Sequence, residues 1–480
     1  MTADAVVIGS GPNGLAAAIR LAEAGVSVHV IEAADEIGGG TRTAELTLKG
    51  YQHDVCSSVH PMGVVSPFFK SLPLERHGLK FIYPEASVAH PLDNGGVALL
   101  LPGVRDTAER LGIDARKYKN LVEPFVAAAD ALFADALHPT GFPRHPLLMA
   151  RFGLKAIRSA EALWKCFKTD EARALIAGCA AHSILPLDKP ITAAVALIFL
   201  IAGHVKPWPI AAGGSQAITN ALASYLRSLG GTIETGRRIT GPKDLPEARA
   251  YLFDTSPNLL ASGFLGVLPQ GYVNRLNKFR YGPGVFKVDY ALSQSIPWTN
   301  RECLKASTVH LGGRCEEIAA SEAEIWQGRD PQKPFVLLTQ QSEFDGSRAP
   351  KGKHTLWAYC HVPNGSRADL AETIENQIER FAPGFKKTIL KRHAMHTADF
   401  EAYNANYVGG AITGGVADLW QFVTRPVARL NPYTTPNPKI FLCSASTPPG
   451  GGVHGMCGFH AANAALSRLA KLPRSPLAIL

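Results

Sequence analysis

The pattern near the start of the chain with the clearest chemical use is a G-x-G-x-x-G series made by Gly9, Gly11 and Gly14. Glycine at these positions permits a tight turn, a close approach of a pyrophosphate to the backbone, and close packing of a helix on a strand. Glu32 follows 18 residues after Gly14, where a carboxylate can accept both hydroxyls of a ribose and repel a 2′-phosphate. Together these residues predict a dinucleotide site.

Two further glycine clusters extend this prediction. Gly38, Gly39 and Gly40 begin seven residues after the end of the predicted second strand and are followed by Arg42. A long dinucleotide, whose second phosphate and ribityl chain continue past the first loop, fits such a cluster and favours FAD over NAD. The third cluster is STPPGGGVHGMCGFHAA, near the end of the sequence. A helix beginning there would place its positive end beside the N1/C2 carbonyl of a flavin and stabilise the anionic reduced ring.

The elements that must position these residues indicate an α/β fold, α+β overall. Short apolar runs and helix signals predict a strand over 5–8, a helix over 15–24 and a strand over 26–31. Further along, they predict a helix between Gly213-Gly214 and Gly230-Gly231, strands over 232–235, 250–254 and 439–446, and a helix over 458–471. We therefore expect a discontinuous Rossmann-like FAD-binding domain formed by residues 1–83, 205–280 and 430–480. A substrate domain would consist of a helical part, 84–204, and a mostly antiparallel sheet with helices, 281–429.

Composition excludes several functional classes. The 480 residues carry a net charge of +9, but no Lys/Arg block alternates with aromatic residues, so no nucleic acid partner is expected. None of the eight cysteines forms a C-x-x-C pair, and no His/Cys/Asp group has metal-ligand spacing, so no redox dithiol and no metal are expected. No G-x-S-x-G hydrolase motif is present. The absence of a signal-peptide pattern favours a cytoplasmic protein with reduced thiols.

The longest apolar run, from Ile191 to Gly203, is too short to span a bilayer. A buried helix is the favoured interpretation. The alternatives are a wall of a hydrophobic substrate tunnel, or a face that dips into a membrane. A peripheral membrane contact and a partly membrane-associated location therefore stay open, as does the oligomeric state.

Several segments together resemble the FAD-dependent phytoene-desaturase and amine-oxidase superfamily, and in particular its branch named after pyridine nucleotide-disulphide oxidoreductase domain-containing protein 2. They are the N-terminal block with its GGG, GGSQAITNAL, GYQHDVCSSVHPMG, DFEAYNANYVGG and the STPPGGGVHGMCGFHAA tail. The resemblance covers nearly the whole chain. It implies FAD contacts, by position, at Gly9, Gly11, Gly14, Glu32, Gly39, Gly40, Arg42 and Ile239, and flavin-ring contacts at Gly451, Gly452, Val453 and His454.

One departure concerns Arg42, because relatives often read GGR where this chain reads GGGTR. The guanidinium would then reach the pyrophosphate from a shifted place, or not at all. Some amine oxidases hold FAD through a cysteine thioether, but no cysteine stands at a matching position, so non-covalent FAD is expected. Cys457 lies close to the expected ring and is interpreted as a buried, inert thiol.

Few residues are candidates for acid–base chemistry. They are His454 in the third glycine cluster, His60 in SSVHPMG, and Tyr407 with its neighbour Tyr403 in EAYNANYVGG. For each, the alternative is a packing or cofactor-positioning role. The sequence therefore predicts an FAD-dependent oxidoreductase that acts by hydride transfer to flavin N5. It would desaturate, saturate or isomerise a small apolar substrate, isoprenoid-like or acyl.

Two alternatives stay open at this point. One is an FAD-dependent amine or amino-acid oxidase that uses O2. The other is a flavin-binding scaffold or membrane-surface protein without turnover. Fold-level resemblance assigns a reaction class and not a substrate, so the substrate, the direction of the reaction and the electron acceptor are left open.

Overall fold

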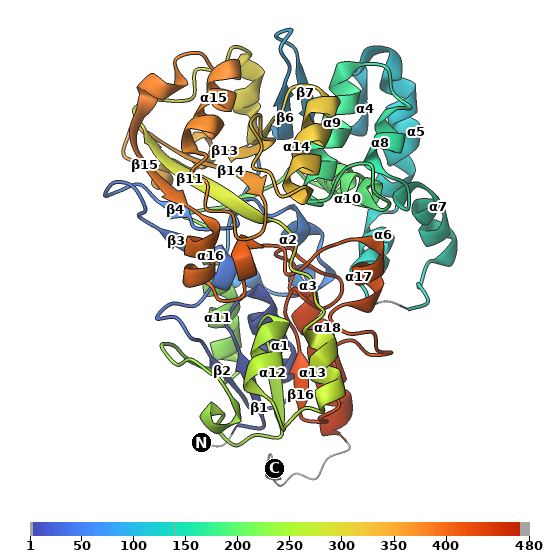
Figure 1. The fold of residues 1–480 in the computed structure, drawn as a ribbon, viewed down its shortest axis with the longest axis vertical. Helices are drawn as coiled ribbons and strands as arrows, with labels where there is room; N and C mark the ends of the chain where they lie inside the picture. The colour runs from blue at the N-terminus through green and yellow to red at the C-terminus, as the bar shows by residue number, and fades with distance from the viewer. Residues whose placement is uncertain (1–2, 140, 471–480) are drawn as a thin grey trace.

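A computed structural model describes residues 3–139 and 141–470, and Figure 1 shows two parts stacked along the long axis. The part that holds both ends of the chain contains a five-stranded parallel sheet in the order β16-β10-β1-β2-β9. Its strands are β1 (Ala5–Ile8), β2 (Val28–Ile31), β9 (Thr232–Glu234), β10 (Ala250–Phe253) and β16 (Ile440–Leu442). Segments far apart in sequence thus build one sheet, with Ala5 paired to both Val28 and Ala250.

The alternation of side chains along β1 explains why helices cover both faces of this sheet. Ala5 and Val7 pack with α1 (Pro12–Glu23), α11 (Gln216–Ser228) and α18 (Met456–Leu469) in one core. Val6 and Ile8 pack with α12 (Pro257–Gly263) and α13 (Gln270–Leu276) in another. A strand buried on both faces must be apolar throughout, as β1 is. The predicted Rossmann-like α/β domain is therefore confirmed.

Most of its predicted elements are present, with small differences at their ends. The strand predicted over 439–446 ends at Leu442, because the following residues leave the sheet and turn, with the Thr447 amide donating to the Ser444 carbonyl oxygen. The helix predicted over 458–471 begins two residues earlier, at Met456. Its predicted end at Lys471, and residues 471–480 of the predicted FAD-binding domain, lie outside the described residues.

The second part contains a seven-stranded sheet in the order β15-β11-β14-β13-β12-β6-β7. Its strands are β6 (Ala86–Pro91), β7 (Val97–Leu100), β11 (Gly284–Leu292), β12 (Ala306–Leu311), β13 (Val336–Thr339), β14 (His354–Val362) and β15 (Ile389–Met395). All neighbours are antiparallel except β12 and β6. This agrees with the predicted mostly antiparallel sheet.

The segment 84–204, predicted to be helical, begins with the two strands β6 and β7. The reason is a long-range pairing, in which Ala86 and Val88 lie beside Ala306 and Thr308 of β12. The composition of the segment itself does not indicate that a strand elsewhere in the chain will pair with it. The rest of the segment is helical: α4 (Val104–Glu109), α5 (Ala115–Val126), α6 (Ala129–Ala136), α7 (Pro146–Ala156), α8 (Ala160–Trp164), α9 (Asp170–Ala181) and α10 (Thr192–Val205).

The remaining elements cover the sheet or connect the two parts. α14 (Cys315–Trp326) and α15 (Ala371–Phe381) pack on the sheet. The connecting elements are β3 (Thr43–Ala44), β4 (His53–Asp54), α2 (Pro61–Val65), α3 (Pro67–Ser71), β5 (Phe81–Ile82), β8 (Ile210–Ala211), α16 (Thr397–Tyr403) and α17 (Leu419–Thr424). Within the described residues, no helix combines the length and apolar character needed to cross a bilayer. All eight cysteines are free thiols.

Candidate cofactor and substrate site

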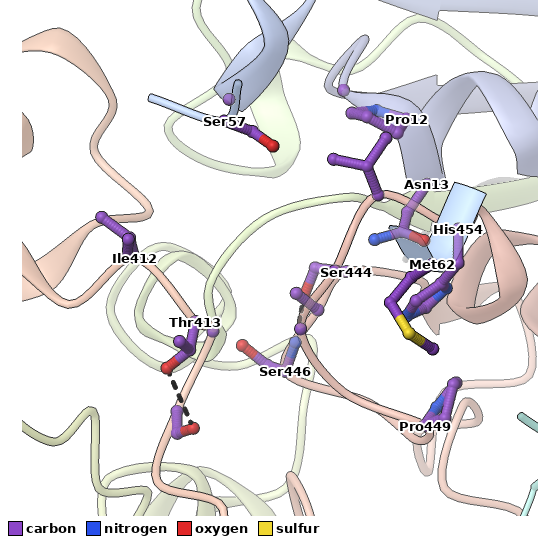
Figure 2. A pocket seen from close by; sticks show the side chains of 18 of the residues that line it. Pro12, Asn13, Ser57, Met62, Ile412, Thr413, Ser444, Ser446, Pro449 and His454 are labelled. Atoms are coloured by element: carbon purple, nitrogen blue, oxygen red, sulfur yellow. Dashed lines mark hydrogen bonds between the residues drawn. The ribbon is translucent and has the colours of Figure 1, made fainter. Parts of the chain in front are cut away.

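A cavity of about 1370 Å³ lies between the two parts of the molecule. All three glycine clusters contribute to its wall, and Figure 2 shows a close view of it, with Asn13, Met62 and His454 on one side and Ile412 and Thr413 on the other. The opposite walls come from the seven-stranded sheet and from α7, α10 and α17. The cavity is large enough for a dinucleotide together with a second ligand, since small-molecule pockets are usually about 300–1,000 Å³.

The first glycine loop has the geometry that a pyrophosphate cradle requires. Gly9 has φ +102°, a conformation that side-chain-bearing residues rarely adopt. A Cβ atom on Gly14 would overlap the Gly9 carbonyl oxygen, and one on Gly11 would lie 2.9 Å from Asp254 Oδ2. The loop leads into the N-terminus of α1, whose free amides and dipole favour an anion. These residues therefore fit a dinucleotide.

Glu32 stands at the end of β2 with its carboxylate held in place. Oε2 accepts hydrogen bonds from the Ser10 amide at 2.8 Å and the Ser10 hydroxyl at 2.6 Å, and Oε1 accepts one from the Ala34 amide at 2.9 Å. The side chain is buried yet lines the cavity, as does Ile239 from the loop after β9. A ribose at this end would meet a fixed acceptor.

Arg42 lies at the same end, but its guanidinium is occupied. Nη2 lies 3.3 Å from Glu32 Oε1, Nε donates to the Glu36 carbonyl oxygen at 3.0 Å, and the group lies 5.3 Å from the centre of the Tyr403 ring. Arg42 lines the cavity. This arrangement gives Arg42 a role in fixing Glu32, and its contact with a pyrophosphate stays a prediction.

Asp254 is a buried carboxyl group that the sequence reasoning did not use. It follows β10 directly, and its Oδ2 accepts a hydrogen bond from the Gly14 amide at 2.7 Å. Burial raises its pKa to about 7, the nearby charge of Glu32 acts in the same direction, and the Gly14 hydrogen bond opposes them. The signal was present in the sequence: an acid at the carboxyl end of a strand, where α/β sheets bind ligands.

Two tyrosines cover the second glycine cluster. The Tyr403 hydroxyl donates to the Gly39 carbonyl oxygen at 2.8 Å, and a Cβ atom on Gly40 would overlap the Tyr407 hydroxyl. Both side chains line the cavity, and burial raises the pKa of both phenols. The structure thus brings Tyr407 next to the predicted flavin site as a neutral phenol, and a catalytic role for it stays a prediction.

The third cluster forms the turn that leads into α18. Gly450 and Gly452 have φ +111° and +126°, and a Cβ atom on Gly451 would lie 2.6 Å from the Thr413 carbonyl oxygen. A Cβ atom on Gly458 would overlap the Asn13 carbonyl oxygen, so α18 and α1 touch through their backbones. Both helices therefore begin beside the cavity, as the sequence predicted, and Val453 lines it between them.

The two candidate histidines are both buried at the cavity wall. His454 Nδ1 accepts a hydrogen bond from the Met456 amide at 3.0 Å, which places the proton of the neutral ring on Nε2 and caps α18. His60 Nε2 lies 2.9 Å from the Ser215 hydroxyl. Burial lowers the pKa of each to about 4. This geometry favours positioning roles, while acid–base roles stay predictions.

Arg425 is a second group that sequence reasoning missed. Its guanidinium is buried, lines the cavity, and donates to the carbonyl oxygens of Gly414, Ala445 and Ser446 at 3.0 to 3.3 Å. No carboxylate of the described residues forms an ion pair with it, and burial lowers its pKa to about 10. It therefore offers a positive charge at the cavity wall. An arginine before a proline in a loop gives no local signal of this.

One branch of the cavity is apolar. Its lining side chains come from α10 and the residue before it (Ile191, Ala194, Val195, Ile198, Phe199), from α7 (Met149, Phe152, Leu154), and from α17 (Leu419, Phe422, Val423). α10 buries one face and turns the other to the cavity, so the buried-helix and tunnel-wall interpretations both describe it. Two β-branched residues in this wall, Ile184 and Ile191, have positive φ values of 52° and 65°. Such strain is concentrated at functional sites.

The seven-stranded sheet forms the wall that faces these elements. Thr308, Thr339 and Trp357 lie side by side on one face across β12, β13 and β14, with Leu337 and Tyr359 in the next row. The rings of Trp357 and Tyr359 are 4.8 Å apart and nearly perpendicular. Among the lining residues the acidic side chains are Glu32 and Asp254, and each accepts a hydrogen bond from an amide of the first glycine loop. No group that could hold a metal ion occurs among the described side chains.

Comparison with known proteins agrees with this geometry. Residues 7–72 match the model of the NAD(P)-binding Rossmann-like domain family. The chain is 25% identical to pyridine nucleotide-disulfide oxidoreductase domain-containing protein 2 of Mus musculus, over 96% of this chain and 92% of the mouse protein. It is 24% identical to a lycopene-forming phytoene desaturase of a Paracoccus species, over 95% of each chain.

A solved structure shares the fold over the whole length. Putrescine oxidase, in its wild-type form bound to putrescine, superposes with a TM-score of 0.61 at 19% identity, covering 98% of this chain and 99% of that chain. At this identity the likeness concerns the fold. In sequence the chain is thus similar to a phytoene desaturase, and it shares its fold with putrescine oxidase.

Proposed function

Because this chain belongs to the FAD-dependent oxidoreductase superfamily that includes phytoene desaturases and amine oxidases, we propose that it oxidises or reduces an apolar substrate. The substrate class is isoprenoid-like or acyl, and FAD is held without a covalent bond. The observation that carries this proposal is the apolar branch of the cavity, which runs from the third glycine cluster to the faces of α7, α10 and α17 and contains no carboxylate.

The cofactor assignment is supported by the match between the wall and the parts of a dinucleotide. Gly9, Gly11 and Gly14 would hold the pyrophosphate, and Glu32 would accept the ribose hydroxyls. Gly451 and Gly452 line the cavity with backbone alone, which would let a ring approach the chain closely. Cys457 donates to two backbone carbonyl oxygens and burial raises its pKa to about 11, so it is an unreactive thiol. These features support non-covalent FAD.

When bound, FAD supplies a hydride acceptor or donor at N5 of its ring. The chain's own residues have three tasks. The apolar side chains of α10 and α17 exclude water and position a hydrocarbon segment against the ring site. The N-terminus of α18 and the Arg425 guanidinium present positive charge to the cavity. His60 and His454 remain neutral at pH 7 because burial lowers their pKa values to about 4.

Hydride transfer from a hydrocarbon is compatible with this set of residues. A proton that leaves such a substrate needs an acceptor within hydrogen-bond reach. In the part of the cavity away from the first glycine loop, the ionisable side chains that line the wall are neutral histidines, neutral phenols, the Cys56 thiol, whose pKa is raised by burial, and Arg425. We infer that water accepts this proton, with the neutral Tyr407 phenol as a hydrogen-bond partner of that water, and that positioning contributes most of the rate enhancement.

An amine oxidase is the second candidate. It is favoured by the Trp357–Tyr359 pair, whose perpendicular rings could contact a cationic or neutral amine, and by the fold shared with putrescine oxidase. An ammonium group in the apolar branch would lack a carboxylate partner. The apolar substrate is therefore the stronger proposal.

Anaerobic reduction of the purified flavoprotein tests the two candidates side by side. Acyl and isoprenoid compounds should bleach the oxidised flavin bands, while aliphatic amines and amino acids should not, and no hydrogen peroxide should form with amines under air. Reduction by amines alone would favour the second candidate. The flavin is also reduced chemically and offered an unsaturated acceptor. If no organic donor reduces the oxidised flavin and no unsaturated acceptor reoxidises the reduced flavin, a scaffold without turnover would be favoured.

A matched pair of variants on α10 separates the substrate branch from the cofactor site. Ala194→Trp narrows the branch and should abolish reduction by the active compound without lowering the FAD content, because Ala194 lies in the apolar wall. Ile198→Leu conserves volume and should change the rate by less than about tenfold. Equal activity in both variants would show that substrate does not use this branch.

A further inference from the structure

More than half of the large apolar side chains that are exposed in the described residues lie in two short segments that also line the cavity. Eight large apolar residues with exposures from 39% to 88% fall in two short segments, around α7 and in α17. We call them the mouth surface: Phe142, Leu147, Leu154, Ile157, Leu419, Trp420, Phe422 and Val423. Figure 1 shows α7 and α17 on the same flank of the molecule, near the junction of the two parts. Concentrated apolar exposure of this kind marks an interaction site.

The mouth surface is continuous with the apolar branch of the cavity. Leu154, Ile157, Leu419, Phe422 and Val423 are partly exposed and also line the cavity. The other three residues belong to the same two segments and do not line the cavity. Whatever covers this surface therefore meets the entrance to the substrate branch.

The charges around the mouth surface are mainly positive. All four charged residues between positions 141 and 158 are basic, namely Arg144, Arg151, Lys155 and Arg158. The acidic side chains that follow or flank these segments are paired: Glu161 with Lys165, Asp188 with Lys189, and Asp418 with Arg280. Within the described residues none of these four basic side chains forms an ion pair with a carboxylate, although Arg158 donates to the Ala162 carbonyl oxygen and Arg151 lies over the Phe125 ring. An apolar face beside such basic side chains is complementary to anionic lipid headgroups above an acyl layer.

We propose that the mouth surface docks on a lipid bilayer that contains anionic lipids. The apolar side chains enter the interfacial layer, with Trp420 as the aromatic anchor, and the basic side chains stay at the headgroups. The cavity then opens toward the acyl layer, so an apolar substrate reaches the branch without crossing water. The entry of an apolar substrate from the acyl layer rests on the proposed function. Docking itself depends on the surface alone.

A second copy of the chain, or another protein, would cover the same apolar side chains but fits the observations less well. Self-association would bring the basic residues of two identical faces together, which is unfavourable. It would also place protein over the entrance to the apolar branch. A bilayer surface satisfies the charges and leaves the entrance facing a reservoir of apolar compounds.

Co-sedimentation of the full-length protein with vesicles tests the proposal. Vesicles of phosphatidylcholine with one quarter phosphatidylglycerol should bind the protein, with weaker binding at 0.5 M salt than at 0.05 M because exposed charges are screened. The affinity for vesicles of phosphatidylcholine alone should be lower than the affinity for the anionic vesicles by about tenfold or more. Replacing Arg151 and Lys155 together by Gln should weaken binding to the anionic vesicles, about 5-fold for each charge removed.

The apolar contribution is tested with side chains that do not line the cavity. The triple variant Phe142→Gln, Leu147→Gln, Trp420→Gln should lower vesicle binding at least about tenfold. Ile113→Gln with Leu265→Gln is the matched control, because these residues are also exposed, 75% and 58%, but belong to neither segment of the mouth surface and do not line the cavity. The control pair should bind vesicles like the unmodified protein. FAD content, measured in every variant, should not change.

Trp420 also gives a direct signal. It is 73% exposed, and the next most exposed tryptophan is Trp326 at 38%. In a Trp326→Phe background, anionic vesicles should shift the tryptophan emission to shorter wavelength, and bromine-labelled acyl chains should quench it. Both effects should disappear in Trp420→Phe. No vesicle binding, or a self-association without lipid that the triple variant abolishes, would overturn the proposal, whereas loss of FAD would instead bear on the proposed function.

Discussion

Replacing Asp254 by Asn should change how the stability of the FAD-free protein depends on pH. Burial raises the pKa of this carboxyl group from 3.8 to about 7. At a pH below 3.8 the group is protonated in both the folded and unfolded chains. Between 3.8 and about 7 the unfolded chain ionises while the folded chain keeps its proton, so the free energy of unfolding falls as the pH rises.

The magnitude follows from the size of the pKa shift. A shift of about three units corresponds to ~4 kcal/mol of stability lost above pH 7, of which ~3 kcal/mol is lost between pH 5 and pH 8. Asn keeps the acceptor for the Gly14 amide, which donates to Asp254 Oδ2 at 2.7 Å, and has no proton to lose. The free energy of unfolding of Asp254→Asn should therefore exceed that of the unmodified protein at pH 8 and match it more closely at pH 5.

Chemical unfolding of both proteins from pH 5 to pH 8 measures this difference, and the comparison cancels the other titrating groups. Asp188→Asn serves as the control, because this carboxyl group is exposed, and its difference from the unmodified protein should change little with pH. If the Asp254→Asn difference is the same at pH 5 and pH 8, the carboxyl group is not buried and protonated as described.

Three further predictions concern the cofactor wall. Gly458→Ala should destabilise the protein by ~1–3 kcal/mol in chemical unfolding, because the new methyl group would overlap the Asn13 carbonyl oxygen. Gly153→Ala in α7, with nothing within 4 Å, should instead stabilise it by up to ~1 kcal/mol, and equal effects of the two would refute the close packing of α1 on α18. The rate of anaerobic flavin reduction should be independent of His60 ionisation between pH 5.5 and 8, because its pKa lies at about 4. A step near pH 6.5 that His60→Gln removes would contradict this. Arg425→Gln should raise the FAD dissociation constant at least ~10-fold in a fluorescence titration, because it removes a buried positive charge from the wall. Arg425→Lys should restore part of the affinity, and unchanged FAD binding in Arg425→Gln would exclude a role for this charge.

The sequence predicted those elements whose signals are local. β1, the first glycine loop and α1 follow each other within about 20 residues, and each step has a residue type that the geometry demands, such as Gly14 where a methyl group would overlap the Gly9 carbonyl oxygen. The turn formed by the third cluster could also be predicted from its residue types, because Gly450 and Gly452 adopt positive φ values that only glycine accepts easily.

The discontinuous Rossmann-like domain was predicted although its segments lie far apart, because each segment carries a signal of its own. Individual long-range contacts without such a signal were not predicted. β6 joins β12 through pairs such as Ala86 with Ala306, and the segment around β6 carries no mark of that partner. Arg425 becomes a cavity residue because α17 folds back over the third cluster. The histidines were named from their place in motifs, but their hydrogen bonds, such as the one between His60 and Ser215, join positions far apart in the chain.

The exposure of the mouth surface could not be predicted from the sequence either. Leu147 and Trp420 are unremarkable in the sequence, where each stands in a short apolar stretch that a buried helix would also explain. Only the fold shows that both are exposed, at 87% and 73%. The apolar run at 191–203, in contrast, is the longest in the sequence, yet it lies inside the protein, where it lines the cavity.

The absorbance spectrum of the purified protein, recorded before and after heat denaturation, decides whether the cavity holds FAD and whether the cofactor is bound non-covalently. We predict a yellow protein with the bands of oxidised flavin, and release of free FAD into the supernatant on heating. A colourless protein that takes up no added FAD would contradict the assignment of the glycine clusters. Flavin that stays with the precipitated chain would contradict the non-covalent attachment.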